Sequence, residues 1–146
     1  MLQFYSDMVK SAGGEKFTES LFKIVDLSKT VSEIKYAASN AATILNAAQI
    51  SFLKQQWRNV RIPEPNLFKA FLSGTDLTGA DLTRVNLTSA YLKNANFKEA
   101  IMKDVQFGVY PDFVCGSGVF CVAMRKKGSL LACGVENGEV QIWDYL

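Results

Sequence analysis

The sequence predicts an α+β protein with N-terminal helices, a central coil of short β-segments and a C-terminal group of antiparallel strands. Three observations support this fold class. Apolar residues recur at helical spacing before residue 50, a bulky apolar residue recurs at every fifth position from Leu67 to Phe107, and strand-like runs separated by turns follow residue 109. We therefore expect a helical cap at 1–50, a repeat segment at 51–108 and a strand segment at 109–146.

The first two helices are separated by a pair of glycines. Residues 1–10 form a short amphipathic segment that ends before Gly13-Gly14. A second apolar stripe at helical spacing includes Leu21 and Val25. These features predict two short helices joined by a tight connection.

The third predicted helix runs from about Val31 to Ile50. Ser28 or Thr30 provides its N-cap, and Glu33 lies three residues after Thr30 in a capping-box arrangement. Alanines dominate one side of this helix and would let another element approach closely. We expect this side to cover the start of the repeat segment.

The period of five in the middle of the chain fits neither a helix nor a flat strand, whose side chains repeat at 3.6 and 2 residues. A coil with four short sides and a corner after every fifth residue satisfies it. Pro63 and Pro65 prevent a helix here and suit an extended start. Phe52, Trp57 and Ile62 are already in phase with Leu67, so the register extends upstream.

The repeat predicts its own core, because one bulky residue of each five points inward and the residue two places earlier is small or modest. The predicted core residues are Leu67, Leu72, Leu77, Leu82, Leu87, Leu92, Phe97, Met102 and Phe107.

The clearest part of the repeat reads T-D-L-T-G, A-D-L-T-R, V-N-L-T-S, A-Y-L from Thr75 to Leu92. It resembles the pentapeptide-repeat family, whose pattern is A-(D/N)-L-x-x. The resemblance implies a right-handed quadrilateral β-helix with four pentapeptides per coil. Residues twenty apart would then stack at about 4.8 Å, the spacing of neighbouring strands. Leu67, Leu87 and Phe107 would form one such column.

The C-terminal segment predicts three short strands, and Asn137-Gly138 is a strong hairpin signal between the last two. This segment resembles one blade of a WD-repeat propeller, and Trp143-Asp144 matches the end of the blade pattern. The Gly-His pair of that pattern is missing. The predicted strands are Val119–Met124, Ser129–Val135 and Glu139–Trp143.

Composition excludes several kinds of chemistry. The 146 residues have a net charge of +2 and contain no histidine, so neither a histidine-activated nucleophile nor a histidine-ligated zinc is available. No phosphate-binding G-x-x-x-x-G-K-(S/T) loop occurs. We expect no enzyme activity, no cofactor and no metal.

The three cysteines are Cys115, Cys121 and Cys133. An odd number with no paired spacing argues against a disulfide framework, and their neighbours are apolar. We expect reduced, buried thiols in a cytoplasmic protein. The longest apolar stretch is too short and too polar to cross a bilayer, so we expect no membrane partner.

Phe71 and Tyr91 are the candidate interaction residues. Both precede an inward leucine and lie twenty residues apart, so they should stack on one outer face. Such an exposed aromatic pair is either covered by the terminal segments or offered to a partner. We favour cover by the terminal segments, and keep the pair as a candidate interaction surface.

Other conspicuous residues predict surface or turn positions. Asp76 and Asp81 lie on adjacent faces, point outward at turns and fit structural turn positions better than an acid–base pair. Lys93, Lys98 and Lys103 would point to three different faces. We therefore expect no nucleic-acid partner.

The order of the segments resembles the junction of NACHT-type signal-transduction NTPases, between the upstream switch module and a downstream WD propeller. We expect a non-catalytic scaffold or protein-interaction module with protein partners, and interpret the chain as a connector portion of a larger protein or the product of a shortened gene. Its last strand has an exposed edge that would allow self-association. The alternative is a nucleic-acid mimic or topoisomerase-binding protein, a role known in the pentapeptide-repeat family.

Overall fold

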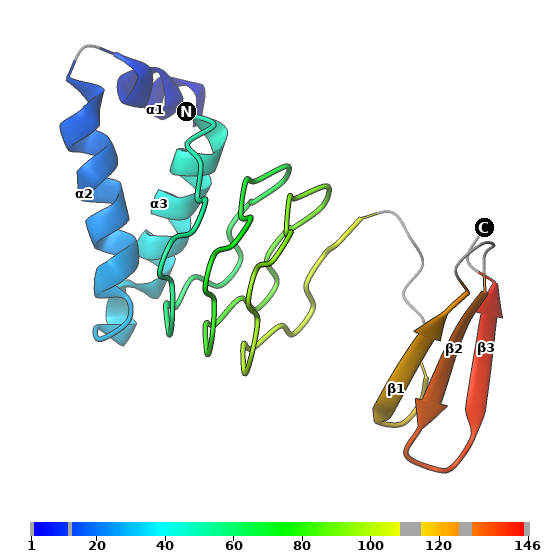
Figure 1. The fold of residues 1–146 in the computed structure, drawn as a ribbon. Helices are drawn as coiled ribbons and strands as arrows, with labels where there is room; N and C mark the ends of the chain where they lie inside the picture. Colours follow the sequence, from blue (N-terminus) through cyan, green and yellow to red (C-terminus); the bar gives the residue numbers. More distant parts are fainter. Residues whose placement is uncertain (1, 12, 109–114, 126–129, 145–146) are drawn as a thin grey trace. The chain divides into compact units, whose positions relative to one another are not determined.

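A computed structural model describes residues 2–11, 13–108, 115–125 and 130–144 (Figure 1). The chain forms two compact units, Met1–Gly108 and Val109–Leu146. The first unit contains the helices and the five-residue repeat, and the second contains three strands. Among the described residues, no helix is both long enough and apolar enough to cross a membrane.

The helices are α1 (Leu2–Lys10), α2 (Gly14–Leu27) and α3 (Lys35–Ala47), with a single 3-10 turn at Ser32–Ile34 before α3. Helix α2 and helix α3 pack side by side, as Figure 1 shows. Gly13 has a φ of 92°, a conformation that only glycine adopts readily, and it separates α1 from α2.

The predicted capping box at Thr30 is wrong. Residue Ile34 occupies the N-cap of α3 and makes no side-chain cap bond. The Thr30 hydroxyl instead donates to the carbonyl of Leu27. A 3-10 turn interrupts the interval between Thr30 and α3, so the spacing to Glu33 no longer corresponds to one continuous helix.

Residues 51–108 wind in successive turns connected by single parallel bridges, with no strand longer than one bridge (Figure 1). The bridges join residues twenty positions apart. For example, Asp76 pairs with both Gln56 and Asn96. The predicted twenty-residue stacking and the upstream start of the register are therefore confirmed.

Every fifth residue from Lys54 to Asp104 has a positive φ, between 55° and 70°. At most of these positions the following residue donates its N–H to the carbonyl three positions back, as Val60 does to Trp57 at 3.4 Å. Pro65, which follows Glu64, has no N–H to donate. A positive φ at the third residue of such a turn is the type II arrangement, which normally favours glycine. Only Gly74 and Gly79 are glycines in this series.

One hydrophobic core runs through α2, α3 and the turns. The predicted core residues Leu67, Leu72, Leu77, Leu82 and Leu87 are at most 2 % exposed. The last turn departs from the prediction. Leu92, Phe97 and Met102 are only partly buried, and Phe107 is 56 % exposed. These side chains lack a described turn beyond them to complete their cover.

Hydrogen bonds join the helices to the first turns. The Ser28 hydroxyl accepts the N–H of Arg61 at 3.0 Å, and the Arg61 guanidinium donates to the Ser28 carbonyl at 3.0 Å. Buried alanines of α3, among them Ala38 and Ala42, contribute to the same core. The alanine-rich helix therefore caps the repeat, as its sequence predicts.

The second unit is an antiparallel sheet in the order β1–β2–β3 (Val119–Met124, Leu130–Val135 and Val140–Asp144). The hairpin predicted at Asn137-Gly138 is present, because Val135 accepts the Gly138 N–H at 3.0 Å. Its geometry needs the φ of 87° at Gly138. Three helices, parallel bridges and this sheet agree with the α+β class.

Candidate functional site

The aromatic pair, Phe71 and Tyr91, stacks in parallel on the outside of the turns. Their ring centroids lie 4.9 Å apart with an angle of 9° between the planes, and their backbones form a parallel bridge. Each ring points outward because the following residue, Leu72 or Leu92, points inward.

The pair is not fully covered. Phe71 is 47 % exposed and Tyr91 is 56 % exposed, so the described residues do not provide the cover that we favoured from the sequence. Phe68, at the corner before Phe71, is also exposed. Together these rings make an apolar surface next to the end of α3.

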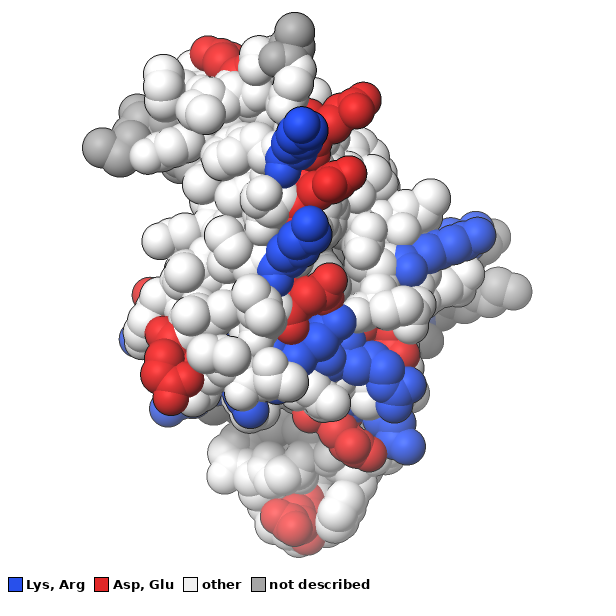
Figure 2. Space-filling model, turned by 90° about the vertical axis from the view of Figure 1, so that its left-hand side faces the viewer, with Lys and Arg blue, Asp and Glu red and all other residues white. Residues whose placement is uncertain are grey.

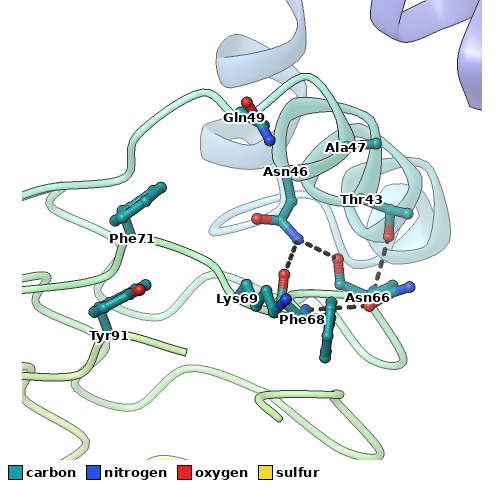
Figure 3. Close-up of a pocket in the computed structure, with 9 residues that line it drawn as sticks. All are labelled: Thr43, Asn46, Ala47, Gln49, Asn66, Phe68, Lys69, Phe71 and Tyr91. Atoms are coloured by element: carbon teal, nitrogen blue, oxygen red, sulfur yellow. Dashed lines mark hydrogen bonds between the residues drawn. The ribbon is translucent and has the colours of Figure 1, made fainter. Parts of the chain in front are cut away.

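A cavity of about 380 Å³ lies between the end of α3 and the aromatic pair, and we call it the α3 cavity (Figure 3). Its volume falls in the lower part of the usual range for ligand pockets, roughly 300–1,000 Å³. The α3 cavity is lined by Thr43, Asn46, Ala47, Gln49, Asn66, Phe68, Lys69, Phe71 and Tyr91.

Three polar contacts fix the wall of this cavity. The Asn46 amide nitrogen donates to the carbonyls of Asn66 at 3.1 Å and Phe68 at 3.0 Å. The hydroxyl of Thr43 accepts the N–H of Asn66 at 3.0 Å. The side-chain oxygen of Asn46 points away from these bonds, toward the Phe71 side of the cavity (Figure 3). It is therefore an acceptor placed beside the aromatic pair.

Gln49 also lines the cavity and lies above Asn46 in Figure 3. Its backbone has a φ of 62°, which turns the chain sharply after α3. No hydrogen bond of its side-chain amide is found within the described residues. The amide can therefore both donate to and accept from a bound group.

Lysines are the only charged residues in the segments that form this face. Lys69 lies over the Phe68 ring, with 5.0 Å between its amino nitrogen and the ring centroid. Lys54 and Lys93 lie at the other corner of this face. The backbone N–H of Lys54 donates to the carbonyl of Ser73, and the N–H of Gly74 donates to the carbonyl of Lys93, so the three turns stack at this corner. Segments 46–55, 66–74 and 86–95 contain no Asp or Glu.

The charges elsewhere are mixed. Arg58 pairs with Asp76 at 3.2 Å, and Arg84 pairs with Glu64 one turn away. On the face drawn in Figure 2, basic and acidic side chains alternate. The lysines beside the aromatic pair differ from these paired residues, because their own segments contain no acidic side chain.

Asp76 and Asp81 occupy the turn positions expected for them. Each carboxylate accepts the N–H and the hydroxyl of the threonine two residues later, at 2.5–3.1 Å. Bonds from Thr78, with a smaller contribution from Arg58, hold the pKa of the Asp76 carboxyl below its usual value. An ionised carboxylate with these partners is a structural group and does not provide a general acid.

The cysteines differ from the expectation of three buried thiols. Cys133 is buried, Cys115 is half-buried and Cys121 is exposed. Burial raises the pKa of the Cys133 thiol, and the neighbouring Cys115 adds to this effect. The described part of the chain contains no group of three metal-binding side chains.

A second cavity, of about 620 Å³, lies among the three helices and is lined mostly by apolar side chains such as Phe17, Leu21 and Ile44. The sequence did not indicate either cavity. Both depend on how α3 is placed against other elements, and neither local spacing nor composition encodes that placement. The signals for the α3 cavity in the sequence are its aromatic pair, which the repeat predicts, and Asn46 and Gln49 near the end of the alanine-rich helix.

Comparison with known proteins identifies one segment. The model of the pentapeptide-repeat family matches residues 66–104 with eight copies of the repeat. Searches of curated proteins and of solved structures gave no significant match. The resemblances to a WD-repeat blade and to a NACHT-type junction stay predictions. Residues 66–104, which carry Phe68, Lys69 and the aromatic pair, are thus a run of pentapeptide repeats.

Proposed function

We propose that this protein is a non-catalytic protein-interaction module whose contact surface is centred on the aromatic pair. The observation that carries the proposal is the stacking of two half-exposed aromatic rings beside the α3 cavity. Exposed apolar clusters with a polar rim are typical of interaction sites, and aromatic residues often dominate their binding energy.

A non-catalytic role is supported by the chemistry that the chain offers. It lacks histidine, and the paired acidic corners Asp76 and Asp81 are engaged in turn bonds. The α3 cavity contains amides, two hydroxyls and one lysine, which can position a ligand. The Thr43 hydroxyl accepts the N–H of Asn66, and the Lys69 amino group lies over the Phe68 ring, so neither is arranged as a nucleophile with its base.

The proposed architecture is the right-handed quadrilateral β-helix of pentapeptide-repeat proteins. Parallel bridges at a separation of twenty residues and corners at every fifth residue support it. In a larger parent protein, the helical cap, the repeat and the sheet would act as a cytoplasmic connector between a switch module and a WD propeller. Under this proposal the sheet is the first blade of that propeller.

The alternative role as a nucleic-acid mimic would need an acidic surface along the turns. The turns instead carry the ion pairs Arg58–Asp76 and Arg84–Glu64 and the lysines beside the aromatic pair, and the net charge of the chain is +2. We therefore favour a protein partner over this alternative.

The test is quantitative affinity capture from the source cell with the purified protein as bait. The double variant Phe71→Ser and Tyr91→Ser should lose the specifically captured proteins. Ile101→Ser is the matched control, because Ile101 occupies the same repeat position on another face and is 56 % exposed. Equal capture by all three proteins would contradict the proposed surface.

A further inference from the structure

The aromatic stack ends at the α3 cavity. Phe52 N donates to Phe71 O at 2.9 Å, just as Leu72 N donates to Tyr91 O at 3.0 Å one turn later. Ser51 therefore occupies, in the first turn, the position that Phe71 and Tyr91 occupy in the next two. A serine has no ring and cannot continue the stack. The face of the Phe71 ring that points away from Tyr91 is therefore not covered by a third stacked ring.

The polar groups around this open ring face suit a peptide backbone. Asn46 offers a side-chain oxygen, and Gln49 offers both an oxygen and an N–H group. An extended peptide presents N–H and C=O groups that match amides of this kind. Asn46 is held in place by its two bonds to the repeat, so its acceptor is already positioned before binding.

The lysines of this face favour a ligand with acidic residues on both sides of its central group. Lys69 lies at one corner, and Lys54 and Lys93 lie at the other. None of the three has a salt bridge among the described residues, and their segments contain no acidic side chain. A peptide with carboxylates on both sides of a central aromatic side chain would complement these lysines.

We infer that the α3 cavity binds an extended acidic peptide through one aromatic side chain, which stacks on the open face of Phe71 while flanking carboxylates pair with Lys54, Lys69 and Lys93. The inference rests on the proposed function and specifies the chemistry of the partner. Single-stranded nucleic acid is a poorer fit, because it stacks its bases on successive separate aromatic side chains, whereas Phe71 and Tyr91 already stack on each other.

The direct test is fluorescence anisotropy with three labelled peptides and the full chain. The first is Gly-Glu-Glu-Trp-Glu-Glu-Gly, the second replaces Trp by Ala, and the third replaces every Glu by Lys. We expect saturable binding of the first peptide and affinities at least about tenfold weaker for the other two. A labelled oligothymidylate of similar length should bind more weakly than the first peptide.

Variants of the protein locate the binding. Phe71→Ser should weaken binding of the first peptide about tenfold, whereas Ile101→Ser should leave it unchanged. Ser51→Phe adds the third ring of the column and should block binding without removing any contact residue. Lys69→Glu should weaken binding, whereas Lys103→Glu, at a corner of another face, should not. A thermal melt of each variant separates a loss of binding from a loss of fold.

Several results would overturn the inference. They are the absence of binding, equal affinity for the glutamate and lysine peptides, full affinity in Ser51→Phe, and tighter binding of the oligothymidylate. If these occur while affinity capture still depends on Phe71 and Tyr91, the surface is an interaction site for a different partner chemistry. If capture is also unchanged, the proposed function fails as well.

Discussion

The residue at each corner of the repeat adopts a conformation that most side chains avoid. Lys69, Arg84 and Glu99 have φ values of 56–58°, where an L-residue costs roughly 1–2 kcal/mol relative to its preferred backbone. Stacking and turn hydrogen bonds across the whole coil must offset this cost. A glycine at a corner avoids this backbone cost, so replacing Gly79 should reveal it.

We predict that Gly79→Ala lowers the free energy of unfolding by more than Gly74→Ala. Both glycines have a positive φ, 66° and 70°, so the backbone penalty is shared. A Cβ at Gly79 would lie only 2.4 Å from the side-chain oxygen of Asn59, whereas at Gly74 the nearest atom is a lysine carbon at 3.3 Å. Urea denaturation monitored by circular dichroism measures the difference.

The matched test adds Asn59→Gly to Gly79→Ala. Asn59 itself has a φ of 57°, so glycine suits the position and the close contact disappears. The double variant should recover the difference between the two single variants. Identical midpoints for Gly74→Ala and Gly79→Ala would show that the Asn59 contact is unimportant.

The sequence carried only part of the information at this scale. Asp and Asn before the central apolar residue predict side-chain bonds to nearby backbone, and five of them accept the N–H two residues later. Positive φ at lysine, arginine and glutamate could not be predicted, because these side chains show no local preference for it. The stacked neighbours impose the conformation, so it is a property of the assembled turns.

At the scale of the element, the period of five predicts which side chain of each turn is buried, and helical spacing predicts α1 to α3. The same reasoning fails at the ends of the elements. Phe107 continues the sequence pattern but is largely exposed, since a position in a repeat is buried only when another layer covers it. The α3 cavity also escapes prediction, because it arises where Thr43 and Asn46 meet Asn66 across two elements.

The central column supplies the prediction at this scale. Leu87 is 2 % exposed and belongs to the core shared by the helices and the turns. Leu87→Asp places a carboxylate there with no cation in the apolar core to pair with it. We expect the free energy of unfolding to fall by more than about 4 kcal/mol, which is most of the stability of a domain near the lower end of the usual range of about 5–15 kcal/mol. Thermal denaturation followed by circular dichroism measures this loss.

Asn86→Asp is the control for Leu87→Asp. It introduces the same charge one residue away, at a position where the repeat pattern accepts either Asp or Asn, and its oxygen can still accept the N–H of Thr88. We expect its effect to stay within about 1 kcal/mol. If Leu87→Asp melts like the parent protein, the inward register of the repeat is wrong.

At the scale of the whole molecule, the helices and the repeat share one core, whereas the three strands pair only with one another among the described residues. Contacts of the first unit therefore account for its own stability, and we predict that residues 1–108 fold without residues 109–146. Differential scanning calorimetry of this truncated chain should give a melting temperature within about 4 °C of the corresponding transition in the full chain, a shift that corresponds to about 1 kcal/mol or less.

A second truncation, to residues 1–86, tests whether the repeat itself matters. It removes Leu87 and the turn after it, so it uncovers side chains such as Leu67 and Leu72. It also removes the carbonyls of Thr88 and Tyr91, which accept the N–H groups of Lys69 and Leu72. A stack of turns gains stability from each neighbouring layer, hence this shorter chain should lose its cooperative transition. Loss of the transition already in residues 1–108 would mean instead that the strand segment is needed for the stability of the first unit.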